Sequence, residues 1–330
     1  MATLRRRAVT VAAALALSTV ACSPGEVRQP VEEETAPTPQ STGGKCGKLD
    51  IAYSPGNGYE ASAFIVGRLA TDELGCDVSY VKTSSRKAWR LVASGRADVY
   101  LDAFGSPGVQ QRLTAPDGPV TVLGPNGVSG GVDVLAPYFM ADYGIETARD
   151  LPDLPAAVFG TPGPSLSTVP ALLPLAQSFL ESQGLDFRLK NYVDTHPRAG
   201  MRDLLAAPRA NDGTKNPNFY LVEGPRMFLG DGPGRISVQI PGSAAEGCVP
   251  DARTTLCSLV DFAYVKIVNS QFAASGSPAY NLVYNYQLMP EQASTILELV
   301  ELSGFDVGEA DVVSWINTHP DTWRRWLRKP

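Results

Sequence analysis

Short apolar runs alternate with amphipathic helices from residue 48 to residue 104. Apolar residues dominate Lys48–Tyr53, 77–81 and 97–104, and each run has the length of a buried strand. Between them, 59–74 and 85–94 carry apolar residues at helical spacing, and each segment is followed by a glycine that can end a helix. This β-α-β-α-β order predicts a parallel sheet with crossover helices, which places the chain in the α/β class.

The same alternation continues after residue 119, and it predicts a second α/β unit followed by a helical tail. We expect further strands at 120–123, 158–160, 187–192, 219–222, 236–240 and 262–268. We expect turns at 127–131 and 161–164 and helices at 165–184, 198–206, 271–285, 290–302, 308–318 and 319–327.

The first 22 residues have the pattern of a secretory signal. Three arginines, Arg5 to Arg7, precede an uninterrupted small and apolar run that ends at Ala21. This run is too short to be a transmembrane helix. Because a cysteine follows small residues here, we expect residues 1–21 to be removed as a lipoprotein signal peptide and Cys22 to carry lipid. An ordinary signal peptide cut near Ala21 is the alternative, and both place the protein outside the cytoplasm.

Residues 22–44 are rich in Pro, Glu, Ser, Thr and Gly, so they cannot bury enough apolar surface to fold, and we expect a disordered tether. Loss of residues 1–21 removes three basic and no acidic residues, which changes the formal net charge from −6 to −9. An acidic chain argues against a nucleic-acid partner and against electrostatic attachment to an anionic membrane. Lipid on Cys22 would then be the membrane anchor.

The other cysteines fall into two pairs that are local in sequence, and in an oxidising compartment we expect the disulfides Cys46–Cys76 and Cys248–Cys257. With the cysteines so assigned, a Cys/His metal site or a cysteine nucleophile lacks its parts. For His319, at a helix boundary, we expect a structural role. The sequence has no G-x-S-x-G, P-loop or H-E-x-x-H motif. We therefore expect no catalysis, no metal and no cofactor.

Five weak motifs occur in order between residues 48 and 327. They are the strand 49–53, the segment 88–104 that reads A-W-R-L-V-A-S-G-R-A-D-V-Y-L-D-A-F, the stretch 134–138 with the later Asp150-Leu151, the stretch 219–228, and the tail 310–327 with its three tryptophans. This order resembles the substrate-binding proteins of ABC importers, in the glycine betaine/choline/proline-betaine family related to OpuAC.

The resemblance implies an α/β, two-lobe fold of the type II periplasmic-binding-protein kind, with the ligand in a cleft between the lobes. Lobe 1 would comprise residues 45–133 and 259–330, and lobe 2 would comprise residues 134–258. The protein would be a monomer that closes like a hinge, and bound ligand would favour the closed state. The loaded form would dock on the ABC permease in the membrane.

Members of this family hold a quaternary ammonium with aromatic faces, because the π quadrupole of the ring attracts a cation. This chain departs from the pattern, since its four tryptophans lie on expected helices, where we expect packing roles. Aromatic residues at expected strand ends and cleft loops remain as candidates for a cage. They are Tyr53, Tyr59, Phe104, Tyr138 and Tyr220. For each of them, a half-buried place in the sheet without ligand contact is the alternative.

Three carboxylates, Glu60, Asp102 and Glu223, are candidates to face a cationic ligand, and a solvated or helix-capping carboxylate is the alternative. Glu223 stands where the resembled motif has an aromatic residue, and a carboxylate suits a ligand with N–H donors better than a trimethylammonium. Ser165 is expected at the start of a long helix, where free N–H groups would hold a ligand carboxylate or where the serine would simply cap the helix.

These expectations describe an extracytoplasmic, lipid-anchored substrate-binding protein of an ABC importer. It would capture a small osmolyte-like amine or zwitterion of the glycine betaine, choline or proline-betaine class and perform no chemistry. One alternative is a binding protein of the same fold for a different polar or cationic solute. Another is an extracytoplasmic enzyme or signalling lipoprotein that reuses the cleft.

Overall fold

The computed structural model describes residues 46–55, 60–104, 107–154, 156–159, 163–170, 172–195, 201–210, 217–229, 231–232, 234–238, 240, 262–304 and 306–328. The predicted signal peptide, Cys22, the tether, Tyr59 and the Cys248–Cys257 pair lie outside these ranges. Within them, no helix is both long enough and apolar enough to cross a membrane.

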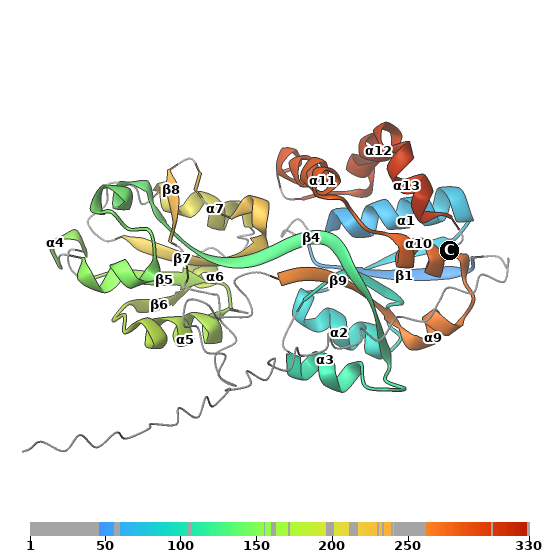
Figure 1. The fold of residues 1–330 in the computed structure, drawn as a ribbon, viewed down its shortest axis with the longest axis horizontal. Coiled ribbons are helices and arrows are strands. Elements are labelled where there is room, and N and C mark those ends of the chain that lie inside the picture. Colours follow the sequence, from blue (N-terminus) through green and yellow to red (C-terminus); the bar gives the residue numbers. More distant parts are fainter. Residues whose placement is uncertain are drawn as a thin grey trace, which may run out of the picture. The chain divides into compact units, whose positions relative to one another are not determined.

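The first part of the chain forms the parallel sheet that its pattern predicts. β1 (Lys48–Tyr53) pairs in parallel with β2 (Asp77–Lys82) on one side and with β3 (Val99–Ala103) on the other. α1 (Glu60–Leu74) and α2 (Ser85–Ala93) are the two crossover helices. They pack into separate apolar clusters on opposite faces of the sheet (Figure 1), so both faces of these strands are buried.

The sheet continues through one strand of 18 residues, β4 (Val120–Pro137). The first part of β4 pairs antiparallel with β9 (Phe262–Asn269), and β9 also pairs with β3. The second part of β4 pairs antiparallel with β7 (Asn218–Pro225). Gly130 pairs with both the first residue of β9 and the last residue of β7. We call Gly130 and these two partners the junction, because β4 passes there from one set of strands to the other (Figure 1).

The expectation of a turn at 127–131 is wrong, because these residues continue β4. The pairing of β4 with β9 shifts register between Val122 and Ser129, and this irregular part is crossed by the segment that precedes α11. Gly127 has φ +95°, and a Cβ atom there would collide with the backbone of Leu288. The glycines therefore permit close approach of neighbouring chain segments instead of reversing the chain.

The remaining strands extend the same sheet, in the order β2-β1-β3-β9-β4-β7-β5-β6. β5 (Ser165–Thr168) pairs in parallel with β7 and with β6 (Arg188–Asn191), while β8 (Arg235–Val238) pairs with the end of β4. α5 (Leu173–Gln183) packs on one face of these strands, and α7 (Met201–Ala210) contributes to the apolar cluster on the other face.

Two expected elements in this part of the chain are wrong. Val158 and Phe159 lie in a helix, α4 (Ala156–Phe159), and not in a strand. The helix expected over 165–184 begins only at Leu173, because residues 165–168 form β5. Pro170 disfavours a helical conformation at the residue before it, and β5 is paired on both sides, so sheet pairing prevails over the helical spacing. Five short helical segments were not expected from the sequence: α3 (Pro107–Leu113), η1 (Tyr138–Tyr143), η2 (Ala148–Asp153), α6 (Tyr192–Thr195) and η3 (Arg226–Phe228).

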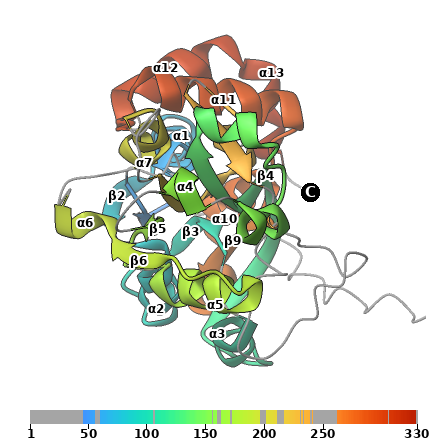
Figure 2. The same cartoon turned by 90° about the vertical axis from the view of Figure 1, so that its left-hand side faces the viewer.

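The C-terminal helices cover the face of the sheet that carries α1. Figures 1 and 2 both show α11 (Pro290–Leu302), α12 (Glu309–Thr318) and α13 (Pro320–Trp326) together on that side. The single helix expected over 271–285 is two helices, α9 (Ser270–Ala274) and α10 (Pro278–Asn285), since Gly276, Ser277 and Pro278 interrupt it.

The four tryptophans have the packing role that the sequence predicts. Trp315, Trp323 and Trp326 are buried among the C-terminal helices, and Trp89 is a buried residue of α2. His319 lies between α12 and α13, where its ring stacks on Trp315 with centroids 4.5 Å apart and its Nδ1 lies 2.9 Å from the Trp315 carbonyl oxygen. This geometry agrees with a structural role for His319 at the helix boundary.

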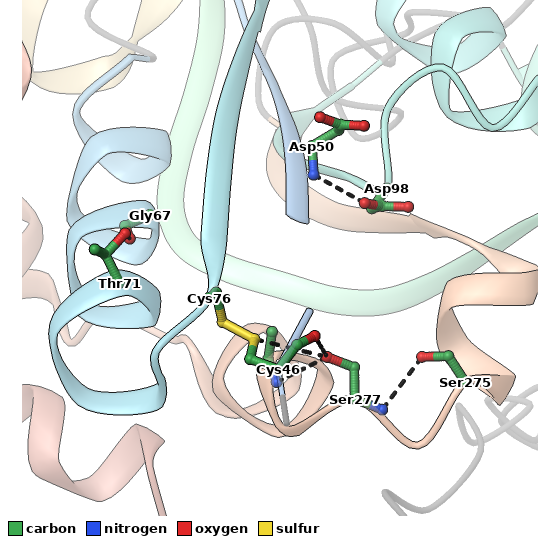
Figure 3. Close-up of a disulfide and its surroundings, with 9 residues drawn as sticks. Cys46, Asp50, Gly67, Thr71, Cys76, Asp98, Ser275 and Ser277 are labelled. Atoms are coloured by element: carbon green, nitrogen blue, oxygen red, sulfur yellow. Dashed lines mark hydrogen bonds between the residues drawn. A yellow bond between two sulfur atoms is a disulfide. The ribbon is translucent and has the colours of Figure 1, made fainter. Parts of the chain in front are cut away.

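The disulfide expected between Cys46 and Cys76 is present (Figure 3). It joins the residues just before β1 and just before β2, and Ser277 donates a hydrogen bond to the Cys46 carbonyl oxygen at 3.3 Å. The disulfide and this bond therefore tie the starts of two parallel strands to the start of α10.

We predict that Gly127→Ala lowers the free energy of unfolding by about 2–4 kcal/mol, because the new methyl group combines backbone strain with collision against Leu288. Gly124→Ala is the matched control, since Gly124 also has positive φ but has no atom within 4 Å of a new Cβ. It should cost only about 1 kcal/mol. Urea unfolding measures both, and equal losses would contradict the close-approach explanation.

Candidate functional site

Two buried carboxylates lie at the carboxyl-terminal edge of the parallel strands, where α/β sheets carry their ligand sites. Glu60 is the first residue of α1 and is 1% exposed, and Asp102 is near the end of β3 and is 3% exposed. Burial of two acids so close to each other is costly unless hydrogen bonds or a cation compensate for it. This region is therefore a strong candidate for the binding of a positively charged group.

The Asp102 carboxyl group is held by hydrogen bonds from two side chains, one on β4 and one on α1. The Asn126 side chain donates to Asp102 Oδ1 at 2.9 Å and to the Leu101 carbonyl oxygen at 3.0 Å. Ser62 of α1 also bonds to the Asp102 carboxyl group, and Tyr286 donates to Ser62 Oγ at 2.9 Å. We call Glu60, Ser62, Asp102, Asn126 and Tyr286 the acidic network.

Lys266 fixes the segment that carries Tyr286. Its buried Nζ donates to the carbonyl oxygens of Tyr284 and Tyr286, each at 2.6 Å. These carbonyls lie at the end of α10, where backbone oxygens lack helical partners, so the lysine satisfies them. Burial lowers the pKa of Lys266 to about 7. The lysine thus holds Tyr286 in place against Ser62 from outside the acidic network.

The surroundings of Asp102 favour its neutral form. Burial is the largest cause, and the nearby charge of Glu60 acts in the same direction, whereas the hydrogen bonds from Ser62 and Asn126 oppose it. Burial prevails and raises the pKa of Asp102 to about 8. At neutral pH, and without a bound cation, the carboxyl group therefore mostly holds its proton.

Three aromatic rings cluster at the junction, and we call Phe104, Phe262 and Tyr264 the aromatic cluster. Phe104 stacks on Phe262 with centroids 5.1 Å apart, and Tyr264 meets both rings edge-on. A Cβ atom at Gly130 would collide with the rings of Phe262 and Tyr264, so glycine allows the rings to lie over β4. The loop after β3 is also anchored here, since Trp89 donates from Nε1 to the Phe104 carbonyl oxygen at 3.0 Å.

Glu223 approaches this region from β7. It is partly buried and lies two residues before the end of β7 at the junction. The pKa of Tyr100 is raised well above its ordinary value, first by burial and then by the charges of Asp102, Glu223 and Glu60. The Tyr100 hydroxyl therefore lies within electrostatic reach of all three carboxylates that the sequence singles out, which come from β3, β7 and α1.

Two other candidate residues, Tyr53 and Tyr220, belong to the same large apolar cluster as the aromatic cluster and Tyr286. Tyr53 packs against Phe64 and Tyr80, and Tyr220 packs edge-on against Tyr192. Tyr138 is 57% exposed and directly follows β4. The end of β4 lies beside the start of β7, whereas the junction lies at the end of β7.

Ser165 does not lie at a helix N-terminus, and this correction follows from the strand at 165–168. It is the first residue of β5, is buried, and donates to Asn218 Oδ1 at 2.6 Å. Pairing of Ser165 with Asn218 puts it at the amino-terminal edge of β5 and β7, the opposite edge from the junction. Its hydroxyl is used within the sheet, and the segment that leads into α5 begins after Thr168.

Sequence reasoning missed Ser62, Asn126, Phe262, Tyr264 and Tyr286. A signal existed for Phe262 and Tyr264, because two aromatic residues at i and i+2 open an expected strand that returns to the first part of the sheet. Asn126 and Tyr286 lie in irregular segments far apart in sequence, and no pattern relates them to Asp102.

The chemistry available at this site is binding by charge, hydrogen bonds and aromatic surface. Among the described residues, no group of three or more His, Cys, Asp or Glu side chains is placed to hold a metal ion. The buried acids favour a cation, and the adjacent rings add apolar and cation–π contact for its substituents.

We predict that Asp102→Asn removes a pH dependence of stability. The folded pKa of Asp102 is about 8 and its ordinary value is 3.8, so the folded protein binds the extra proton and loses stability as pH rises between these values. Between pH 5 and 7.5, the unfolding free energy of the wild type should fall relative to the variant by up to about 1.4 kcal/mol per pH unit. Urea unfolding at several pH values measures this, with exposed Asp142→Asn as the control. Parallel curves for wild type and Asp102→Asn would contradict the raised pKa.

No protein-family model matches the sequence, and no curated protein matches it. Solved structures do match. The lactococcal OpuAC in its closed-liganded conformation with glycine betaine is 17% identical, covers 86% of this chain and 100% of its own, and has a TM-score of 0.60. A choline-binding protein of an ABC transporter, in complex with choline, is 12% identical over 86% of this chain and 92% of its own, with a TM-score of 0.61.

The glycine betaine/L-proline-binding protein ProX from Borrelia burgdorferi is also 12% identical, covers 86% of this chain and 97% of its own, and has a TM-score of 0.61. These matches span nearly the whole of each solved chain, and at such low identity they concern the fold. The resemblance drawn from the order of the motifs is thereby confirmed for the fold, and the chain has the two-lobe α/β architecture of the OpuAC-like substrate-binding proteins.

Proposed function

We propose that this protein is the substrate-binding component of an ABC importer and captures a small cationic or zwitterionic amine. The observation that carries the proposal is the pair of buried carboxylates, Glu60 and Asp102, beside the aromatic cluster at the junction. A small amine would bring a positive charge to these buried acids, and its apolar substituents would contact the rings.

The location of the site supports capture by hinge closure. The junction is where β4 and β9 connect the two sets of strands, so groups from both sets meet there. We propose residues 45–133 and 259–330 as lobe 1 and residues 134–258 as lobe 2. A ligand that contacts Asp102 from one lobe and Glu223 from the other binds the closed state more tightly, and only this difference in affinity drives closure.

The anchor and the location are proposed from the N-terminal sequence. Lipid on Cys22, with residues 22–44 as a tether, would keep the binding domain at the outer face of the membrane beside its permease. The three matched proteins named above are solute-binding proteins, which supports binding without catalysis.

A thermal-shift screen of the mature chain with Cys22→Ser tests the proposal. We expect at least one of glycine betaine, choline, carnitine, proline betaine, polyamines or amino acids to raise the unfolding temperature by about 5 °C at a hundredfold excess over its Kd. Mass spectrometry should recover the ligand unmodified. A modified ligand would indicate an enzyme, and the absence of any shift would contradict the proposed function.

A further inference from the structure

We propose that the amine bound at this site carries at least one N–H bond and donates it to Asp102, so that a quaternary ammonium is a poor ligand. This inference rests on the proposed function, because it names the class of amine that the same site takes.

Burial of the two acids favours a ligand that donates a hydrogen bond. Glu60 and Asp102 are 1% and 3% exposed, so water can hardly serve as a hydrogen-bond partner for their carboxylates. Within the acidic network, Asp102 accepts hydrogen bonds from neutral donors only, namely Ser62 and Asn126. A charged N–H donor would add a bond about twice as strong as a neutral one, whereas a quaternary ammonium supplies charge without any donor.

Tyr100, which is not a member of the acidic network, also favours a polar ligand. Its side chain is fully buried, and its hydroxyl has no hydrogen-bond partner in the described part of the chain. The same hydroxyl lies within electrostatic reach of Asp102, Glu223 and Glu60. A buried hydroxyl without a partner costs about 1–3 kcal/mol. A polar ligand that enters among these carboxylates would give the Tyr100 hydroxyl a hydrogen-bond partner.

The candidate aromatic rings already pack against other rings, which disfavours a cage for a quaternary ammonium. One face of Phe104 is stacked on Phe262, Tyr53 contacts Phe64 and Tyr80, and Tyr220 contacts Tyr192. A cage for a quaternary ammonium needs several ring faces directed at one point. The aromatic cluster offers ring edges and apolar surface, which suits the substituents of an amine whose charge is met by a carboxylate.

Ligand binding at this site is then linked to a proton. The groups that face Asp102 are Ser62 and Glu60 from α1 and Asn126 from β4. Tyr286 bonds to Ser62 from behind, and Tyr100 lies with Asp102 on β3. Before an amine binds, these surroundings leave Asp102 mostly protonated near neutral pH. To accept an N–H bond from an ammonium, the carboxyl group must release its proton to the buffer. The affinity for such an amine therefore rises with pH.

Matched ligand pairs test the proposal with the unmodified binding protein. Each pair differs by one N-methyl group, N,N-dimethylglycine against glycine betaine and N,N-dimethylethanolamine against choline. Calorimetry at pH 7.5, where all four nitrogens are positively charged, measures Kd. We expect the N–H member of at least one pair to bind tenfold or more tightly than its quaternary partner, because only it donates a hydrogen bond to the Asp102 carboxylate.

The possible results separate this inference from the proposed function. If a quaternary member binds as tightly as its N–H partner or more tightly, the inference is wrong and the proposed function stands. If none of the four ligands binds, and the wider thermal-shift panel is also silent, both fail.

A variant adds a second readout. The Kd of the preferred N–H ligand should fall by up to tenfold per pH unit between pH 6 and 7.5 in the wild type, and calorimetry in buffers of different ionisation enthalpy should show the release of a proton. Asp102→Asn should abolish both effects, while Asp142→Asn, at an exposed position, should leave them unchanged. A wild-type affinity that does not vary with pH would overturn the role given to Asp102.

Discussion

Asn126 is the residue on which both the crossing strand and the candidate site depend. It is fully buried in the irregular part of β4, and its side chain donates to the end of β3 while its Oδ1 accepts from the Val128 N–H at 2.8 Å. Its carbonyl oxygen accepts from the Leu288 N–H at 2.8 Å. One amide therefore stabilises the bulge in β4, joins it to β3 and to the segment before α11, and orients Asp102.

This arrangement explains why a strand with several glycines can serve as the connection between two sets of strands. The glycines remove side chains where Leu288 and the rings of Phe262 and Tyr264 approach the strand, and Asn126 restores the hydrogen bonds that a regular ladder would have made. The same irregularity brings the acidic network and the aromatic cluster to one end of the sheet. Burial raises the pKa of Asp102 by more than its two neutral hydrogen bonds lower it. The charge of Asp102 therefore depends on whether a cationic ligand enters the site.

The sequence predicts the fold well where local pattern and final structure agree. The sequence allowed prediction of the strands and helices from Lys48 to Ala103 and of the Cys46–Cys76 disulfide. The order of its motifs also allowed prediction of the two-lobe fold. Prediction failed where contacts distant in sequence decide the structure. Sheet pairing on both sides makes 165–168 a strand, and pairing with β9 and β7 makes 127–131 part of β4.

The candidate site was predictable in part for the same reason. Asp102 and Glu60 follow from the rule that ligands bind at the carboxyl ends of parallel strands, and the structure places both in one buried region. Their partners Asn126 and Tyr286 come from irregular segments, so only the folded chain reveals them. The most direct measurement is a ¹³C NMR titration of the Asp102 carboxyl carbon in the empty protein, assigned by comparison with Asp102→Asn. Burial of Asp102 predicts titration near pH 8, and titration near pH 4 would contradict a pKa raised by burial.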